Sequence, residues 1–176
     1  FAQEGAKVAI ADLNKQAADA VAGEIESAGG RSISVAMDVT SEDDVNNGVA
    51  AIVAAFGAID ILVSNAGIQI VHPLEEFTYA EWRKVLAVHV DGAFLTTRAC
   101  LPHMYKAGRG GSIIYMGSIL SKEAAQLKAP YVTAKHGLVG LAKVTAKEGA
   151  KYGVRANVIC PGFVRTSMQD RELVWE

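Results

Sequence analysis

Cysteine is scarce in this sequence of 176 residues, which contains only Cys100 and Cys160. The two residues lie far apart in apolar stretches, and neither belongs to a CxxC motif or a Cys/His cluster, so no metal site is predicted. Isolated cysteines of this kind are typical of buried or half-buried thiols in a reducing compartment. We therefore expect a cytoplasmic protein.

Basic charge and long apolar runs are lacking as well. The formal net charge is -2 and no run is rich in Lys or Arg, which argues against a nucleic-acid partner. The apolar stretch 49–70 is broken by polar and turn-forming residues, so it predicts a helix, a turn and a strand rather than a membrane span. These residues are Gly57, Asp60, Ser64 and Asn65. Apolar residues make up 51% of the chain and charged residues 20%, which is typical of one globular domain.

Apolar runs alternate with segments of helical periodicity along the chain. Continuous apolar runs predict strands, and the third is too apolar to have a solvent-exposed face. Alternation with short loops predicts an α/β fold, a doubly wound, Rossmann-like parallel sheet in one domain over residues 1–176, with helices on both faces. The strands are expected at 7–12, 32–38, 59–64, 112–116 and 154–160. The helices are expected at 14–27, 40–56, 78–104, 130–152 and, briefly, 167–174.

The first six residues, FAQEGA, are typical of the end of a helix that stops at a glycine. A domain seldom begins in the middle of a helix. We therefore expect the chain to be a fragment of a longer domain.

Polar residues follow several predicted strands, where ligands of an open parallel sheet bind. Asp12 could accept hydrogen bonds from both hydroxyls of an adenosine ribose, which would disfavour the 2′-phosphate of NADP, or it could cap the next helix. Asp38 could accept from an adenine amino group or form a turn. After the third strand, Asn65, Ala66 and Gly67 would let the backbone approach a ligand closely, or would form a plain tight turn.

Tyr131 and Lys135 are four residues apart on a predicted helix, so they share a face. A nearby ammonium group lowers the pKa of a phenol, as a general acid/base for an alcohol/carbonyl pair requires. Ser118 ends the fourth strand, where its hydroxyl could polarise a carbonyl oxygen. The YxxxK motif alone is a weak signal, and the order of all these pieces gives it weight.

In this order the sequence resembles the short-chain dehydrogenase/reductase family. The matching segments cover nearly the whole chain: EGAKVAIADLN, MDVT, VSNAGIQ, VDGAFLTTRACLPHM, MGS, LKAPYVTAKHGLVGLAK and NVICPGFVRT. Gln69 and Lys128 make it most similar to the bacterial D-3-hydroxybutyrate dehydrogenases. The resemblance implies NAD-dependent interconversion of 3-hydroxybutyrate and acetoacetate. The alternatives are a 3-oxoacyl or acetoacetyl-CoA reductase and a non-catalytic nucleotide-binding fragment.

The resemblance also implies a role for each matching residue. Tyr131 would exchange the proton with the substrate oxygen that Ser118 holds, and Lys135 would bind the nicotinamide ribose and lower the pKa of the phenol. Tyr131 and Lys135 would thus touch the cofactor, together with Asp12, Asp38, Val39, Asn65, Ala66, Gly67, Pro161, Gly162, Val164 and Thr166. The hydroxy or keto acid would be bound by Gln69, Ser118, Lys128 and Tyr131.

Three positions depart from the family pattern. His89 stands where the family has a catalytic Asn, and could serve an altered proton relay or simply pack in its helix. Leu120 replaces a substrate-binding His, and Phe163 replaces a Trp. The first strand with its glycine-rich turn and the final helix and strand have no counterpart here, so we expect weak cofactor binding by the chain alone. The full-length family member is expected to be a homotetramer that uses helices 78–104 and 130–152.

Overall fold

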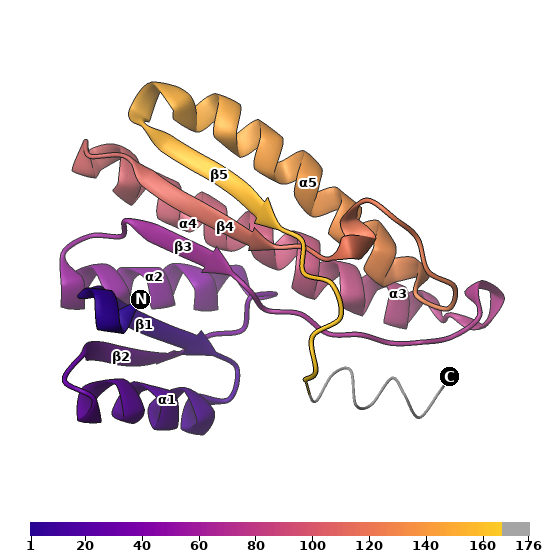
Figure 1. Ribbon diagram of the computed structural model, residues 1–176, viewed down its shortest axis with the longest axis horizontal. Coiled ribbons are helices and arrows are strands. Elements are labelled where there is room, and N and C mark those ends of the chain that lie inside the picture. Colours follow the sequence, from indigo (N-terminus) through magenta and orange to yellow (C-terminus); the bar gives the residue numbers. More distant parts are fainter. Residues whose placement is uncertain (167–176) are drawn as a thin grey trace.

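The computed structural model describes residues 1–166, and its five strands are parallel (Figure 1). Each of the first four strands is followed by a helix or a short helical turn, which confirms the predicted α/β class. The helix expected at 167–174 lies outside the described residues. The strands are β1 (Lys7–Asp12), β2 (Arg31–Ala36), β3 (Ile61–Ser64), β4 (Gly111–Met116) and β5 (Val154–Ile159).

Three helices begin at a residue whose side chain caps them, and two end at a glycine. Asn14, Ser41 and Thr78 each accept a hydrogen bond from a backbone N–H of the first turn that follows. Gly57 and Gly108 adopt left-handed conformations at helix ends. The helices are α1 (Lys15–Ser27), α2 (Glu42–Phe56), α3 (Tyr79–Leu86), α4 (Gly92–Ala107) and α5 (Ala129–Gly149). Short turns of other helix types are η1 (Ala2–Glu4), η2 (Leu74–Glu76), η3 (Ala87–Asp91), η4 (Ile119–Ser121) and η5 (Ala150–Tyr152).

Two predicted helices are subdivided in the structure. The expected helix 78–104 consists of α3, the π-helical turn η3 and α4, and the expected helix 130–152 consists of α5 followed by η5. The first residues form the 3-10 turn η1, which ends at Gly5 with φ 86°, in agreement with the expected helix end.

We predicted an incomplete parallel sheet without its first strand, and the strands that are present form two parallel sheets. β1 pairs with β2, and β3, β4 and β5 form the second sheet in that order. Within residues 1–166 no strand pairs with the other edge of β1 or β3. The expectation that the third strand lacks an exposed face is wrong, because Ile61 and Val63 are 45% and 40% exposed.

Helices cover both faces of the first sheet. In β2, Ser34 bonds to Asp19 of α1, whereas the next residue, Val35, lies against Gly48 of α2. Successive residues of a strand point to opposite faces, so α1 and α2 lie on opposite sides.

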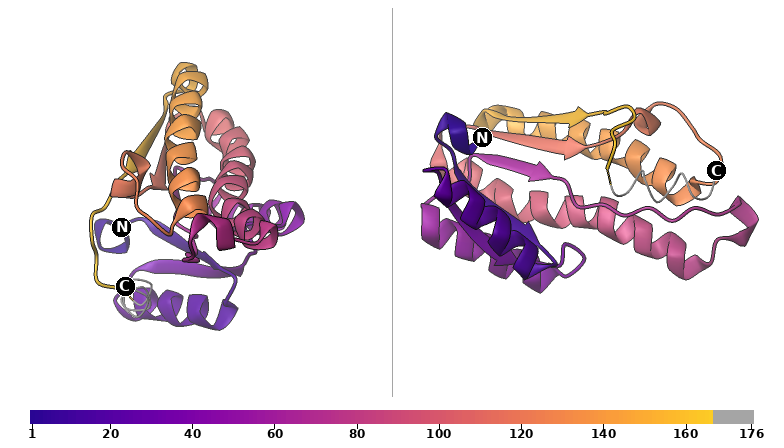
Figure 2. Two further views of the ribbon diagram at one scale, coloured as in Figure 1. Left: turned by 90° about the vertical axis from the view of Figure 1, so that its right-hand side faces the viewer. Right: turned by 60° about the horizontal axis from the view of Figure 1, so that its bottom comes forward.

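Helices α4 and α5 cover one face of the second sheet (Figure 2). The buried Tyr115 hydroxyl of β4 lies 2.8 Å from the Thr97 hydroxyl of α4 and 3.2 Å from the Thr145 hydroxyl of α5. The main core extends from this face to α2. The opposite face carries exposed side chains such as Ile61 and Ile159, so the second sheet departs from the expected two-sided cover. None of the helices in residues 1–166 combines the length and the hydropathy that crossing a bilayer requires.

Candidate active site

The candidate site lies at the carboxyl ends of β3, β4 and β5. At the end of β4, Ser118 starts η4 with a reciprocal cap. The Ser118 hydroxyl accepts from the Leu120 N–H at 3.1 Å, and the Ser121 hydroxyl accepts from the Ser118 N–H at 3.1 Å. Ile119 N–H donates to the Pro161 carbonyl at 2.8 Å, which ties this turn to the end of β5.

The amino-terminal part of α5 supplies Tyr131 and Lys135. They share a face as predicted, with the Lys135 ammonium 5.3 Å from the centroid of the Tyr131 ring. Lys135 is buried, and its Nζ donates to the Met116 carbonyl at 2.5 Å. Burial lowers the pKa of Lys135 to about 8, and the nearby Cys160 partly opposes this shift. Because α5 packs against η4, Ser118 and Tyr131 belong to adjoining elements.

His89 of η3 also lies against Tyr131. The two rings meet edge to face, with centroids 5.3 Å apart and planes at 88°. His89 Nε2 lies 2.8 Å from the carbonyl oxygen of Ile68 and 3.1 Å from its amide nitrogen. Burial, followed by the charge of Lys135, lowers the pKa of His89 to about 4, so the ring is neutral near pH 7.

Two buried polar atoms of this region have no hydrogen-bond partner among residues 1–166. They are Nδ1 of His89 and Nε2 of Gln69. A buried polar group without a partner costs free energy, so these atoms mark places where a polar ligand or a water would bind. The role of His89 in a proton relay therefore stays a prediction.

The close contact with His89 requires a glycine at position 67. A Cβ atom at position 67 would lie 2.6 Å from Cε1 of His89. The preceding Asn65 and Ala66 are exposed at the end of β3, so a ligand can approach their backbone from solvent. The Asn-Ala-Gly segment therefore fits the close backbone approach that a cofactor requires, and it also serves a packing purpose at Gly67.

The two aspartates at the ends of β1 and β2 make local turn contacts. Asp12 is exposed and accepts from the Asn14 N–H at 2.8 Å, while Asn14 itself caps α1. Asp38 accepts from both the N–H and the hydroxyl of Thr40, which lowers the pKa of its carboxyl. Val39 packs against Gly92, where a Cβ would lie 2.8 Å from Cγ2 of Val39. The contacts of Asp38 are those of a turn. Asp38 is half-buried, and its adenine role stays a prediction.

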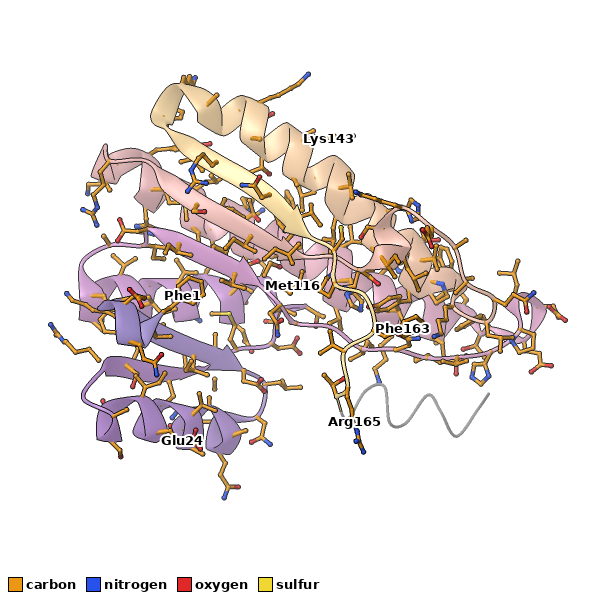
Figure 3. All side chains as sticks on the ribbon, viewed as in Figure 1. Phe1, Glu24, Met116, Lys143, Phe163 and Arg165 are labelled. Atoms are coloured by element: carbon orange, nitrogen blue, oxygen red, sulfur yellow. The ribbon has the colours of Figure 1, made fainter. Side chains whose placement is uncertain are left out.

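The remaining candidates lie on two segments. Lys128 is half-buried and is the N-cap residue of α5, where its carbonyl accepts from the Val132 N–H at 2.9 Å. Leu120 is half-buried beside Ser118. Phe163 is 89% exposed on the segment that leaves β5, as Figure 3 shows for Phe163 and Arg165. Tyr131 lies against Lys135 and His89, and His89 lies against Gly67. Ser118 is on the adjoining turn that is tied to Pro161. Gly162, Val164 and Thr166 are exposed on the segment after β5.

Comparison with known proteins agrees with this geometry. The family described as short chain dehydrogenase matches residues 1–176. The chain belongs to the short-chain dehydrogenase family. The predicted family is therefore confirmed, and with it an oxidoreductase fold whose members use a nicotinamide cofactor.

Named relatives within the short-chain dehydrogenase family differ in substrate. A D-beta-hydroxybutyrate dehydrogenase of Rhizobium meliloti is 39% identical over 136 residues, 77% of this chain and 52% of that protein. A D-threitol dehydrogenase of Mycolicibacterium smegmatis is 37% identical over 168 residues, 96% of this chain and 64% of that protein.

Among solved structures, a gluconate 5-dehydrogenase of Burkholderia cenocepacia in complex with NADP and tartrate has a TM-score of 0.93. It is 34% identical, over 99% of this chain and 68% of that one. The chain thus spans between about half and two thirds of the length of these relatives.

Several contacts of this short-chain dehydrogenase site were not predicted from sequence. The Met116 carbonyl, which accepts from Lys135, and the backbone of Ile68, which meets His89, are main-chain groups without a sequence signature. The reciprocal cap of Ser118 by Ser121 has the three-residue spacing of a capping box, with Ser in place of the usual Glu or Gln.

Proposed function

We propose that this short-chain dehydrogenase oxidises a small hydroxy acid, with Tyr131 as the general base, and that 3-hydroxybutyrate is the substrate. The observation that carries the proposal is the position of the Lys135 ammonium, 5.3 Å from the centroid of the Tyr131 ring, in a buried environment. A positive charge held beside a phenol favours the phenolate, which is the form that removes a proton from an alcohol.

Proton transfer follows from this arrangement. In oxidation, the hydroxyl proton of the substrate moves to the Tyr131 oxygen, and in reduction the proton returns to the carbonyl oxygen. The Ser118 hydroxyl donates to the substrate oxygen as negative charge develops there. The neutral His89 accepts a hydrogen bond at Nδ1 from a water or a polar ligand atom, and so keeps a polar path beside the phenol.

The residues at the strand ends fit a nicotinamide cofactor, which when bound supplies the acceptor for the hydride that leaves the alcohol carbon. Asp12 would bind the adenosine ribose, and Asp38 and Val39 the adenine. The exposed backbone of Asn65 and Ala66 would lie against the cofactor, and residues 161–166 would hold its nicotinamide end. We propose NAD rather than NADP, because the carboxylate of Asp12 would repel a 2′-phosphate.

An anionic substrate fits the side chains available near Tyr131. Gln69 offers a buried amide nitrogen that has no hydrogen-bond partner in the described part of the chain, and Lys128 supplies a positive charge at the start of α5. A charge-assisted hydrogen bond from Lys together with an amide donor would bind a carboxylate. Leu120 cannot donate, so the carboxylate would depend on these two residues.

Two alternatives remain worth testing. A 3-oxoacyl or acetoacetyl-CoA reductase would use the same Tyr131 and Lys135, and the NADP-bound relative supports keeping this candidate. A non-catalytic nucleotide-binding module would retain the strand-end residues without turnover.

A substrate panel separates these candidates. The whole protein is assayed with NAD and NADP against D-3-hydroxybutyrate, D-threitol, gluconate and, in the reverse direction, acetoacetyl-CoA. We expect the highest kcat/KM with NAD and D-3-hydroxybutyrate. A preference for NADPH and the thioester would replace the proposal by the reductase, and cofactor binding without turnover of any alcohol would replace it by the binding module.

We further propose that the protein is a cytoplasmic homotetramer in which α4 and α5 contact a second copy. Phe94 of α4 and Val144 of α5 are 47% and 53% exposed, which supports an apolar contact on these helices. Sedimentation analysis of the whole protein with Phe94→Asp and Val144→Asp should give a smaller species than the parent. An unchanged species would exclude these helices as the contact.

A further inference from the structure

Leu127 has the only non-glycine backbone with a positive φ in residues 1–166. Its φ is 63°, in the left-handed region that side chains other than glycine rarely adopt. Such a conformation is unfavourable for leucine and persists only where surrounding contacts stabilise it. The Leu127 side chain is 37% exposed, so burial of the side chain alone does not account for the conformation.

A backbone hydrogen bond joins Leu127 to a second loop. The His72 N–H donates to the Leu127 carbonyl at 3.1 Å. One of the two loops leads from β3 to η2 and carries Gln69, and the other leads from η4 to α5 and carries Lys128. This bond therefore connects the two segments that carry the proposed ligands of the carboxylate.

Each partner of this bond is fixed to a helix. The His72 ring packs against Phe77 at a centroid distance of 5.4 Å and lies 3.3 Å from a carboxylate oxygen of Glu81 in the first turn of α3. On the other side, the residue after Leu127 is Lys128, whose carbonyl accepts the first hydrogen bond of α5. The left-handed turn at Leu127 thus sets the direction in which the chain enters α5.

We propose that Leu127 is a positioning residue for the substrate. Its left-handed backbone and the bond from His72 hold the loops of Gln69 and Lys128 together before a carboxylate binds. The inference rests on the proposed oxidation of a hydroxy acid, and it adds that substrate affinity depends on the left-handed population at position 127. Loops held in the binding arrangement in advance bind more tightly because less ordering accompanies binding.

Two substitutions at Leu127 separate backbone conformation from side-chain packing. Leu127→Gly removes the side chain but adopts positive φ readily, whereas Leu127→Val keeps an apolar side chain but disfavours positive φ because it is β-branched. If the left-handed backbone holds the loops together, Leu127→Gly binds substrate like the parent and Leu127→Val binds it more weakly. If side-chain packing holds them together, Leu127→Gly is the weaker binder. The matched control is Leu74→Val, which makes the same substitution at a leucine of η2 that is 69% exposed.

Two readouts are measured for the whole protein and its variants. Hydrogen exchange at the His72 amide reports the bond itself without substrate, and KM and kcat for D-3-hydroxybutyrate report its role. For Leu127→Val we expect exchange and KM to rise about tenfold with kcat within about twofold of the parent. For Leu127→Gly and the control we expect both values to stay within about threefold.

The inverse ranking, with Leu127→Gly impaired and Leu127→Val close to the parent, would overturn the proposal. The positioning role would also be overturned if hydrogen exchange at the His72 amide rose only in Leu127→Val while KM stayed the same in every variant. If the parent oxidises no hydroxy acid, the proposed function fails. The exchange ranking then still decides whether Leu127 holds the two loops together.

Discussion

The ring of His89 stands edge-on to the phenol of Tyr131, with centroids 5.3 Å apart and an interplanar angle of 88°. The same imidazole is held at Nε2 by the backbone of Ile68 and leaves Nδ1 buried without a partner in residues 1–166. His89, one of the three residues that depart from the family pattern, is therefore in direct contact with the proposed general base. A neutral ring can accept a hydrogen bond there, as a proton path requires.

Stability should depend on pH through His89. Burial lowers its pKa from the ordinary 6.5 to about 4, so the folded state binds this proton less readily than the unfolded state. The associated stability is complete above pH 6.5 and is lost as pH falls toward 4, by roughly 3 kcal/mol in total. Urea unfolding at several pH values should show a smaller decrease over this range for His89→Asn.

Carboxylates also lose stability in acid, so the difference between the parent and His89→Asn is the relevant quantity. The pKa of Asp38 is lowered by its bonds to Thr40, and this contribution is common to both proteins. Equal acid dependence of the two proteins would mean that His89 is not buried in its neutral form.

Gly67→Ala should impair turnover by displacing His89. The added Cβ would lie 2.6 Å from Cε1 of the ring, closer than real contacts, so one of the two groups must move. We expect kcat to fall about tenfold or more, because small misplacements near the reacting atoms are costly. Rate measurements on Gly67→Ala, His89→Asn and the double variant test the coupling. Strictly additive effects would show that the contact does not matter for catalysis.

Ser118→Ala should lower kcat by about 10²–10³, if its hydroxyl stabilises the developing oxyanion. The hydroxyl also caps η4, and loss of a cap costs only about 1 kcal/mol of stability. Ser121→Ala removes the reciprocal cap and serves as the control in parallel kinetic and unfolding measurements. Similar rates for the two variants would assign Ser118 a structural role alone.

Asp12→Asn should shift cofactor preference toward NADP. Removal of the negative charge ends the repulsion of a 2′-phosphate and weakens the hydrogen bonds to the ribose hydroxyls. We expect the ratio of NAD to NADP affinity to fall about tenfold in calorimetric titrations. Asp43→Asn, which removes an exposed carboxylate from the first turn of α2, should leave the ratio unchanged. An unchanged ratio in Asp12→Asn would remove Asp12 from the ribose site.

The local elements of the fold could be predicted because each has its own sequence signal. Caps such as Ser41 and stops such as Gly57 mark the helix ends, and apolar runs mark the strands. The division into two sheets could not be predicted, because strand pairing depends on which strands meet in space. For the same reason, the exposed positions Ile61 and Val63 had the composition of a fully buried strand.

The candidate site was predictable where two of its side chains lie at a fixed spacing on one helix. Tyr131 and Lys135 meet because four residues make about one helical turn. The acceptor of Lys135, the carbonyl of Met116, is a main-chain group that becomes available only when β4 ends beside α5. The left-handed Leu127 also had no signal, because sequence patterns favour glycine or asparagine at such positions.

The central claim is that the phenol of Tyr131 moves the proton in an NAD-linked oxidation. The most direct measurement is single-turnover reduction of NAD by D-3-hydroxybutyrate with the whole protein and with Tyr131→Phe. We predict that Tyr131→Phe still binds NAD but loses about 10²–10⁴ in rate. A Tyr131→Phe protein that reduces NAD at the rate of the parent would contradict it.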